Sequence, residues 1–474
     1  MAQSRHRHRI TDSDEVLITG GVSTLSPPPS IIELVKDNPR ADAEWKKWLN
    51  NFYEYVGLLT SQVVGMQSIK FGDSPSIDAF ARARVSNPET IFDSKQIHDK
   101  QPLFWDEALT LNGTAPWTQA AASTMMTVTT TADAVARQTF RRFNYQPGKS
   151  QLILMTFVLD ESGGGTGITR EVGMYDANNG IFLQDSAGTI NLVKRNATSD
   201  TTVAQASWNI DVFDGTGTSG KTLDWTKSQI MLIDMEWLGV GRVRIGFVID
   251  GIPYYAHQFV HANTTSGVYM STPNLPLRYY IENAAGAGVQ STLEHICCSV
   301  MSEGGTQDVG ATRVATSGSV FVNANTANTT YAIVGIRLDT DHLDGVAKII
   351  GVSLLEAAAT SVDYEWKLIY DPTVANTANF STAWTDVATG SSFIEYAVGD
   401  NSNPSTNTVT GGTVIASGFV AAGGSKTSSN SDEVDTTLLL GSTIAGVSKQ
   451  IWLCVTPKGT NADVYGSISW KEIS

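Results

Sequence analysis

The chain has 474 residues and a formal net charge of −15, from 32 Lys or Arg and 47 Asp or Glu. Because an acidic chain repels phosphate backbones, this charge disfavours a nucleic-acid-binding protein. No apolar run approaches the roughly 18 residues of a membrane span, and the N-terminus lacks the apolar core of a signal peptide. We therefore expect synthesis in the cytoplasm and no membrane insertion.

Composition predicts a β-rich chain with more than one domain. Charged residues make up 17% of the chain, below the roughly 25% usual in soluble domains, and small polar residues and turn signals take their place. A single core rarely serves more than about 250–300 residues, so two or three domains are expected. The odd count of cysteines (Cys297, Cys298 and Cys454), without a CxxC pair, indicates buried thiols.

Residues 1–40 are predicted to form an extended N-terminal arm. Arginine and histidine alternate from Arg5 to Arg9, which fits either a disordered basic tip or an arm that docks on an acidic partner surface. The proline run within residues 26–30 predicts a stiff polyproline II spacer.

Residues 41–65 are predicted to form one amphipathic helix. Its apolar residues recur in steps of four and three, which is the spacing of a heptad seam. Two interpretations stay open: the helix lies on its own domain, or it is an oligomerisation and anchoring element whose geometry suits a trimer. The seam residues are Trp45, Leu49, Phe52, Val56, Leu59 and Val63.

Residues 66–118 are predicted to be an irregular strap, because few of them are periodic and several prolines interrupt them. Residues 119–305 follow as a predicted β-sandwich body. Its clearest hairpin turns at Asp250-Gly251, a dipeptide that favours a type I′ turn. Before that turn, Arg242 and Arg244 alternate with apolar residues, which predicts one solvated face and one buried face.

A stretch of small polar residues near 305–315 indicates a boundary, and residues 312–474 are predicted to form a C-terminal β-sandwich. The expected fold class is therefore all-β, with two jelly-roll-like sandwiches after the arm and the helix. The strand runs expected in the second sandwich are 330–338, 346–355, 364–370, 391–398, 413–421, 450–456 and 464–470.

No catalytic motif rises above background, so we expect no enzyme, no cofactor and no metal site. The glycine run at 163–165 lacks the Lys-Ser/Thr of a phosphate-binding loop and fits a hairpin tip. The Asp/Gly loop at 211–217 resembles a calcium loop without its bidentate Glu. His257 and His261 would lie roughly 13 Å apart on a strand, too far to share a metal. Paired carboxylates from distant strands, as in glycoside hydrolases, stay open.

Eleven tryptophans raise the alternative of a sugar-binding protein, because exposed aromatic rings stack on sugars. Trp384, Trp452 and Trp470 are the candidates in the C-terminal domain. Large aromatics also dominate cores and subunit interfaces, which is the competing interpretation for each of them.

The first half of the chain resembles a block common in virion structural proteins of tailed phages, a similarity that covers about residues 70–300. Members of that group serve as capsid decorations, tail and baseplate parts, or fibres, and no functional residue set accompanies the pattern. The segments that carry the resemblance are Asp78–Pro88, Thr90–Lys95, Pro102–Glu107, Met235–Gly239, Gly241–Arg244 and Asn274–Tyr279.

The resemblance implies a structural component of the virion and does not choose its location on the particle. We expect the chain to assemble with copies of itself and with capsid, portal, tail or baseplate proteins. We expect a trimer, anchored by its N-terminal part, with the C-terminal domain outward. Arg82, Arg84, Asp93 and Trp105 would make inter-subunit strap contacts, or the arginines would pair within their own chain. The alternatives are a receptor-binding adhesin with a lectin-like site for host surface glycan in the C-terminal domain, and a polysaccharide-degrading enzyme.

Overall fold

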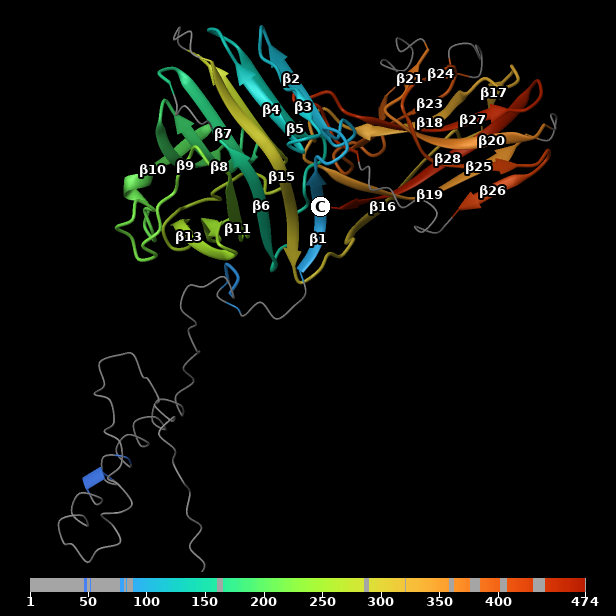
Figure 1. Ribbon diagram of the computed structural model, residues 1–474. Coiled ribbons are helices and arrows are strands. Elements are labelled where there is room, and N and C mark those ends of the chain that lie inside the picture. The colour runs from blue at the N-terminus through green and yellow to red at the C-terminus, as the bar shows by residue number, and fades with distance from the viewer. Residues whose placement is uncertain are drawn as a thin grey trace, which may run out of the picture. The chain divides into compact units, whose positions relative to one another are not determined.

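The computed structural model describes residues 47–48, 52, 77–80, 82, 88–159, 165–284, 290–319, 321–357, 362–375, 384–400, 407–428 and 440–473. The chain divides into two compact units, Met1–Gly72 and Asp73–Ser474. The second unit holds two β-sandwiches, coloured blue to yellow and orange to red in Figure 1. The described ranges include a short 3₁₀ turn, η1 (Gln205–Ser207), and no helix within them is long and apolar enough to cross a membrane.

The first sandwich packs an eight-stranded sheet against a seven-stranded sheet, and all strand pairs are antiparallel. In spatial order the eight-stranded sheet contains β13 (Ile252–Phe259), β12 (Val243–Ile249), β11 (Gln229–Met235), β6 (Ser150–Val158), β15 (Ser291–Glu303), β4 (Ser123–Val128) and β3 (Trp117–Thr118), with β1 (Pro88–Lys95) also paired to β15. The seven-stranded sheet contains β10 (Ser199–Ala204), β9 (Thr189–Asn196), β8 (Gly180–Ser186), β7 (Ile168–Tyr175), β14 (Leu277–Asn283), β5 (Ala134–Thr139) and β2 (Trp105–Thr110).

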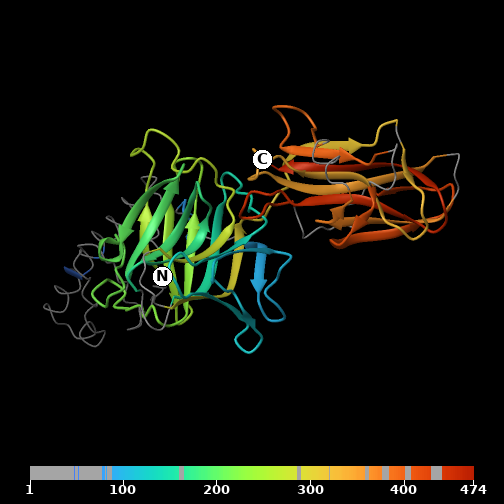
Figure 2. The ribbon, with the colours of Figure 1, turned by 90° about the horizontal axis from the view of Figure 1, so that it is seen from above.

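Alternation along the strands creates the core between these sheets. On β6, Ile153, Met155 and Phe157 are fully buried, whereas Leu152 and Leu154 on the other face are partly exposed. This is the two-residue period expected of a strand with one face toward a core. Figure 2 shows the strands of this sandwich from above.

The second sandwich packs a five-stranded sheet against a six-stranded sheet. The five-stranded sheet contains β16 (Gly310–Thr316), β28 (Ala462–Ile473), β19 (Val346–Glu356) and β26 (Ser425–Ser428), with β17 (Val322–Ala324) also paired to β28. The six-stranded sheet contains β22 (Thr385–Asp386), β23 (Ile394–Val398), β18 (Tyr331–Leu338), β27 (Gln450–Pro457), β20 (Tyr364–Tyr370) and β25 (Thr413–Val420), and a small sheet pairs β21 (Thr373–Val374) with β24 (Val409–Thr410).

Both faces of the six-stranded sheet bury aromatic rings. Trp366 and Trp470 belong to the core between the sheets. On the opposite face Trp452 is fully buried in a smaller apolar cluster that includes Val374 from the small sheet. Gly335 lies across from Trp452 and is required there, because a Cβ atom would come within 2.4 Å of the indole ring.

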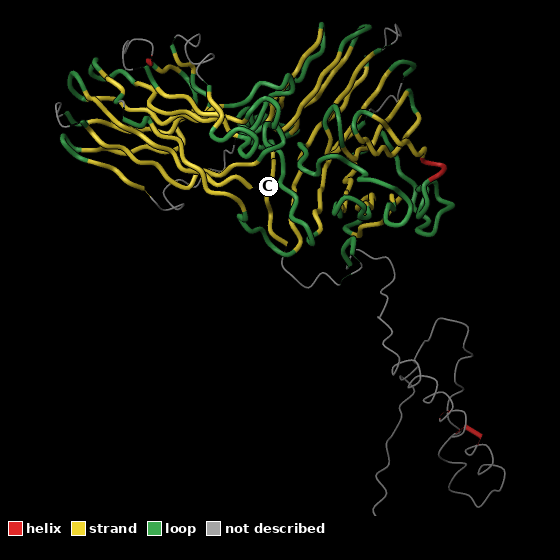
Figure 3. Tube along the Cα trace, turned by 180° about the vertical axis from the view of Figure 1, so that it is seen from behind, coloured by secondary structure: helices red, strands yellow, loops and turns green. Residues whose placement is uncertain are grey.

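The predicted all-β class with two sandwiches is confirmed, and the described chain in Figure 3 is almost entirely strand and loop. The predicted Asp250-Gly251 turn is also confirmed, since both residues have positive φ (54° and 77°), as a type I′ turn requires.

The predicted irregular strap at 66–118 is wrong from Pro88 onward, because β1, β2 and β3 belong to the first sandwich. Proline interrupted the periodic pattern there, yet Pro88 stands at the first position of β1, where a strand tolerates it. The predicted arm at 1–40 lies outside the described residues. Of the predicted helix at 41–65, the structure describes only Lys47, Trp48 and Phe52, which have helical backbone.

Candidate functional site

A short segment before β1 is gripped by two arginines of β12 and the preceding turn. Arg244 Nη2 donates to the carbonyl oxygen of Ile77 at 2.7 Å. Arg242 donates through Nε to Ala79 O at 3.2 Å and through Nη2 to Asp78 O at 3.4 Å. We call Arg242, Arg244 and residues 77–79 the carbonyl clamp. Residues 77–79 are at most 4% exposed, so the clamp holds a buried stretch of backbone.

The gripped segment also closes on itself. The Asp78 carboxylate accepts hydrogen bonds from the amides of Phe80 and Arg82, both at 2.9 Å, and forms an ion pair with the Arg82 guanidinium at 2.6 Å. The Asp78 amide in turn donates to Arg82 O at 2.9 Å. Arg82 thus pairs within its own chain, which favours the second of the two interpretations left open by the sequence.

A buried ion pair holds one arginine of the clamp, Arg244, in place. Arg244 and Asp234, on neighbouring strands β12 and β11, pair with both side chains fully buried. Asp234 also accepts from Ser150 Oγ at 2.9 Å and from the Tyr255 hydroxyl at 3.2 Å. Because a buried charge is stable only when paired and hydrogen-bonded, this network fixes the direction in which Arg244 points.

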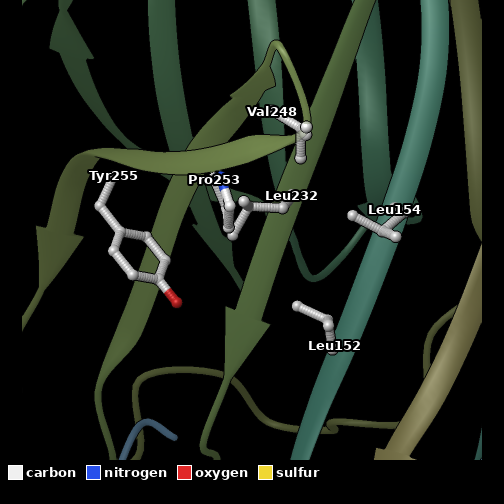
Figure 4. A pocket seen from close by; sticks show the side chains of 7 residues that line it. Leu152, Leu154, Leu232, Val248, Pro253 and Tyr255 are labelled. Atoms are coloured by element: carbon white, nitrogen blue, oxygen red, sulfur yellow. The ribbon is translucent and has the colours of Figure 1, made fainter. Parts of the chain in front are cut away.

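An apolar pocket of about 220 Å³ lies beside this network on the outer face of the eight-stranded sheet (Figure 4). The Tyr255 ring forms one wall, and the remaining lining is aliphatic, so the pocket accommodates an apolar group and holds no acid–base pair. The lining residues are Leu152, Leu154, Leu232, Val248, Gly251, Pro253 and Tyr255.

The second sandwich presents an aromatic ring on the outer face of its six-stranded sheet. Phe419, on the edge strand β25, is 76% exposed, the largest exposed fraction among the large apolar side chains that the structure describes. It lies directly across from Glu365 on β20. Glu365 forms ion pairs with Lys458 at 3.0 Å and with Lys367 at 3.6 Å.

The register places these groups on one small surface. Lys367 lies across from Ser417, two residues along from the Glu365–Phe419 pair. Positions two apart on a strand share a face, and the Lys458 ammonium lies 5.6 Å from the Phe419 ring centroid. Phe419, Ser417, Glu365, Lys367 and Lys458 are called the Phe419 surface below. Burial alone would raise the pKa of Glu365, but the two lysines outweigh it and the pKa is lowered.

No protein-family model and no curated protein sequence matches the chain. Among solved structures, the legume lectin-like domain from Entamoeba histolytica aligns with a TM-score of 0.28 and 9% identity, over 44% of this chain and 96% of that one. The winged bean acidic lectin complexed with methyl-alpha-D-galactose gives 0.30 and 9%, over 46% and 99%. The CBM2 module of the evolved Dit of Lactobacillus casei BL23 phage J-1 gives 0.31 and 7%, over 47% and 99%. The similarity assigns no role to any residue of this chain.

The tryptophans singled out as sugar platforms lie elsewhere than expected. Trp452 and Trp470 are fully buried, and so cannot stack on a ligand in the folded protein. Trp384 is half-buried, packs edge-on against Trp452 at 5.5 Å and is covered by the Arg337 guanidinium at 4.5 Å. The exposed aromatic of this domain, Phe419, was not among the candidates.

The predicted inter-subunit strap residues have different environments in the structure. Trp105 is 2% exposed and its indole donates to Ser94 Oγ at 3.0 Å, so its side chain belongs to the core of its own sandwich. Asp93 is exposed and pairs with Lys95 at 3.1 Å. Arg84 lies outside the described residues, as do the helix residues Trp45, Leu49, Val56, Leu59 and Val63. Their part in subunit contacts stays a prediction.

The Asp/Gly loop has a structural explanation. Asp211 is 4% exposed, and its carboxylate accepts the amides of Phe213 at 2.9 Å and Ser219 at 2.6 Å. The two histidines considered as a pair are buried: Asn209 N donates to His257 Nδ1 at 3.1 Å, and His261 stacks on Tyr269 at 4.0 Å. No group of His, Cys, Asp or Glu in the described ranges is arranged to hold a metal ion.

Proposed function

We propose that the protein is a non-catalytic structural component of a phage particle, anchored by its N-terminal part with the second sandwich outward. The observation that carries the proposal is the carbonyl clamp. Two segments that carry the resemblance to virion proteins take part in it: Asp78–Pro88 contributes Asp78 and Ala79, and Gly241–Arg244 contributes both arginines. In a protein fixed by its N-terminal part with the second sandwich outward, force acts where the N-terminal part meets the first sandwich. The carbonyl clamp holds the chain at this position and strengthens it.

Assembly is the mechanism in this proposal. The chain forms a homo-oligomer, for which a trimer is expected, and contacts capsid, portal, tail or baseplate proteins. Light scattering during size-exclusion chromatography of the full chain should give three copies. Immunogold electron microscopy with an antibody against the second sandwich should label intact particles. A strictly monomeric chain that is also absent from particles would overturn the proposal.

The clamp itself can be tested with one charge-removing change. Arg242→Gln should lower incorporation into particles and speed proteolysis before β1, because two hydrogen bonds to the gripped backbone are lost. Arg313→Gln is the matched control, since Arg313 also donates to a backbone carbonyl, Ser391 O at 2.7 Å, in the second sandwich. Equal incorporation of both variants would contradict a role for the clamp in anchoring.

A receptor-binding adhesin is the second candidate function, and the Phe419 surface favours it. Phe419 is 76% exposed, and the face of an exposed aromatic ring is a surface on which a sugar ring can pack. Binding of the full chain to host surface polysaccharide, measured on a glycan array, tests this function. Absence of any glycan binding would leave the structural role alone.

A further inference from the structure

The strand β25 ends the six-stranded sheet, and its outer edge is open. A bulge at Ile415 interrupts its pairing with β20, and residues 416–420 form its regular part. Within the described ranges, no backbone hydrogen bond joins this regular part to any segment other than β20. Two large apolar side chains of the strand are exposed, Phe419 at 76% and Val414 at 51%. Such an edge offers a row of amides and carbonyls to which another strand can pair.

The sequence of β25 lacks the residues that protect the other edges. Proteins block pairing at a sheet edge with charged side chains, prolines or very short strands. β25 is eight residues long and contains no charged residue and no proline. Each other edge strand of four or more residues in the described ranges contains at least one: Pro253 in β13, Glu89 in β1, Asp200 in β10, Asp106 in β2, Arg313 in β16 and Lys426 in β26.

The regular part of β25 is complementary to a second copy of itself. Antiparallel pairing around a two-fold axis at Gly418 places Phe419 across from Ser417 of the second copy, and Val420 across from Ala416 of the second copy. Each larger side chain then faces a smaller one, and the two glycines face each other. The register with β20 puts Phe419 and Ser417 on the outer face of the sheet, so the ring of one copy has room beside the serine of the other.

The charges beside this edge permit the contact. The outer face next to β25 carries two carboxylates and two ammonium groups, those of Asp363, Glu365, Lys367 and Lys458. Because these four charges sum to zero, two copies of the face meet without net repulsion. In the paired arrangement, Glu365 of one copy and Lys367 of the other stand at opposite ends of one row of side chains.

We infer that β25 pairs with β25 of a second copy of this chain and joins two six-stranded sheets into one continuous sheet. Five paired residues in each copy make a small contact, so the association is weak and reversible unless the copies are already held near each other. The inference goes beyond the proposed function, because it adds a contact made by the second sandwich and is independent of the N-terminal part. Pairing also covers the ring of Phe419.

Sedimentation velocity of the full chain, from about 1 µM to about 1 mM, measures this association. The mass should rise with concentration, first to twice that of the starting oligomer. Phe419→Lys should weaken the association by about tenfold or more, because it removes the apolar contact and places a charge on the edge. Glu365, directly across the strand pair, accommodates the lysine within one copy. Val447→Lys, at another exposed apolar side chain (61% exposed), is the matched control and should associate like the natural chain.

Cross-linking tests the register. Residues directly opposite each other have Cα atoms about 4.5–5.5 Å apart, within disulfide range, whereas diagonal residues lie about 7–8 Å apart, beyond it. Under oxidation, Ser417→Cys and Phe419→Cys should each stay uncross-linked alone and should form a covalent dimer when mixed. The natural chain is the control for the three natural cysteines, two of which are buried. Circular dichroism checks that every variant folds.

The possible results separate this contact from the proposed assembly. A trimer whose mass does not change with concentration would overturn the β25 pairing and keep the trimer. A monomer that doubles in mass, with the doubling lost in Phe419→Lys, would overturn the trimer and keep the pairing. Doubling that persists in Phe419→Lys would place the contact elsewhere. Cross-linking of either cysteine variant alone, to the same extent as the mixture, would overturn the two-fold register at Gly418.

Discussion

Acid should weaken the first sandwich, because it buries three histidines where the protonated form is disfavoured. Burial lowers the pKa of His257 to about 4. Burial, followed by the charge of Arg137, holds the pKa of His295 well below its usual value, and burial also lowers the pKa of His261. Below about pH 6.5 the unfolded chain binds protons that the folded chain does not, so stability falls as the pH falls.

The size of the effect follows from the folded and unfolded pKa values. At pH 5, a histidine with an ordinary pKa when unfolded and a pKa near 4 or lower when folded reduces the unfolding free energy by about 2 kcal/mol. For His257 this is a large part of the ~5–15 kcal/mol that stabilises a typical domain, and His295 acts in the same direction. His261 acts in the same direction.

His295 is the position at which this effect can be removed. Its ring stacks on Tyr279 at 3.9 Å and packs edge-on against Trp105 at 4.4 Å, and neither ring nitrogen has a hydrogen-bond partner among the residues that the structure describes. Phenylalanine keeps the stacking and cannot be protonated. His295→Phe should therefore restore stability at pH 5, by at most the ~2 kcal/mol that the ordinary unfolded pKa allows, and change stability little at pH 7.5.

Urea titrations at pH 7.5 and pH 5, read by hydrogen–deuterium exchange of β15 peptides in the full chain, measure the first sandwich alone. His98→Gln is the control, because His98 is exposed. Unfolding midpoints that coincide at the two pH values would refute the reasoning. So would a His295→Phe variant with the same pH dependence as the natural chain.

Three further changes test the packing described above. Arg244→Met should lower the unfolding free energy by about 3–5 kcal/mol in urea titrations, because it leaves Asp234 charged and buried; a chain of natural stability would contradict the buried pair. Gly251→Ala should lower it by about 1–2 kcal/mol, since φ is +77°, whereas Gly267→Ala, with open space around it, should change it little. Trp452→Ala should lower the unfolding free energy of the second sandwich by about 3–5 kcal/mol, and with it the melting temperature. An unchanged melting temperature would show that the ring is not packed as described.

Local patterns predicted much of the strand content. The run expected at 364–370 matches β20 (Tyr364–Tyr370), and the run at 346–355 matches β19 (Val346–Glu356) within one residue. These strands alternate between a core face and an outer face, so the period of two is visible in the sequence. Residues 88–118 were missed because β1 and β2 carry much of their length exposed, which hides the period.

The candidate sites depend on contacts that no local pattern contains. Alternation predicted a solvated face for Arg244, yet the residue is fully buried because Ile77, distant in sequence, lies over it. Trp452 stands on an outer face of its sheet and is buried because Trp384 and the small β21–β24 sheet pack there. Phe419 also stands on the outer face of this sheet, yet it remains 76% exposed. Which outer face stays open is decided by long-range packing.

The carbonyl clamp holds main-chain oxygens rather than side chains, and this has a consequence for how such a protein diversifies. Every residue offers the same carbonyl group, so the grip places no chemical demand on the segment upstream of Ile77. An anchor of different sequence could be joined at this position without redesign of the body. The junction is thus suited to recombination, in which one sandwich body is combined with different N-terminal regions.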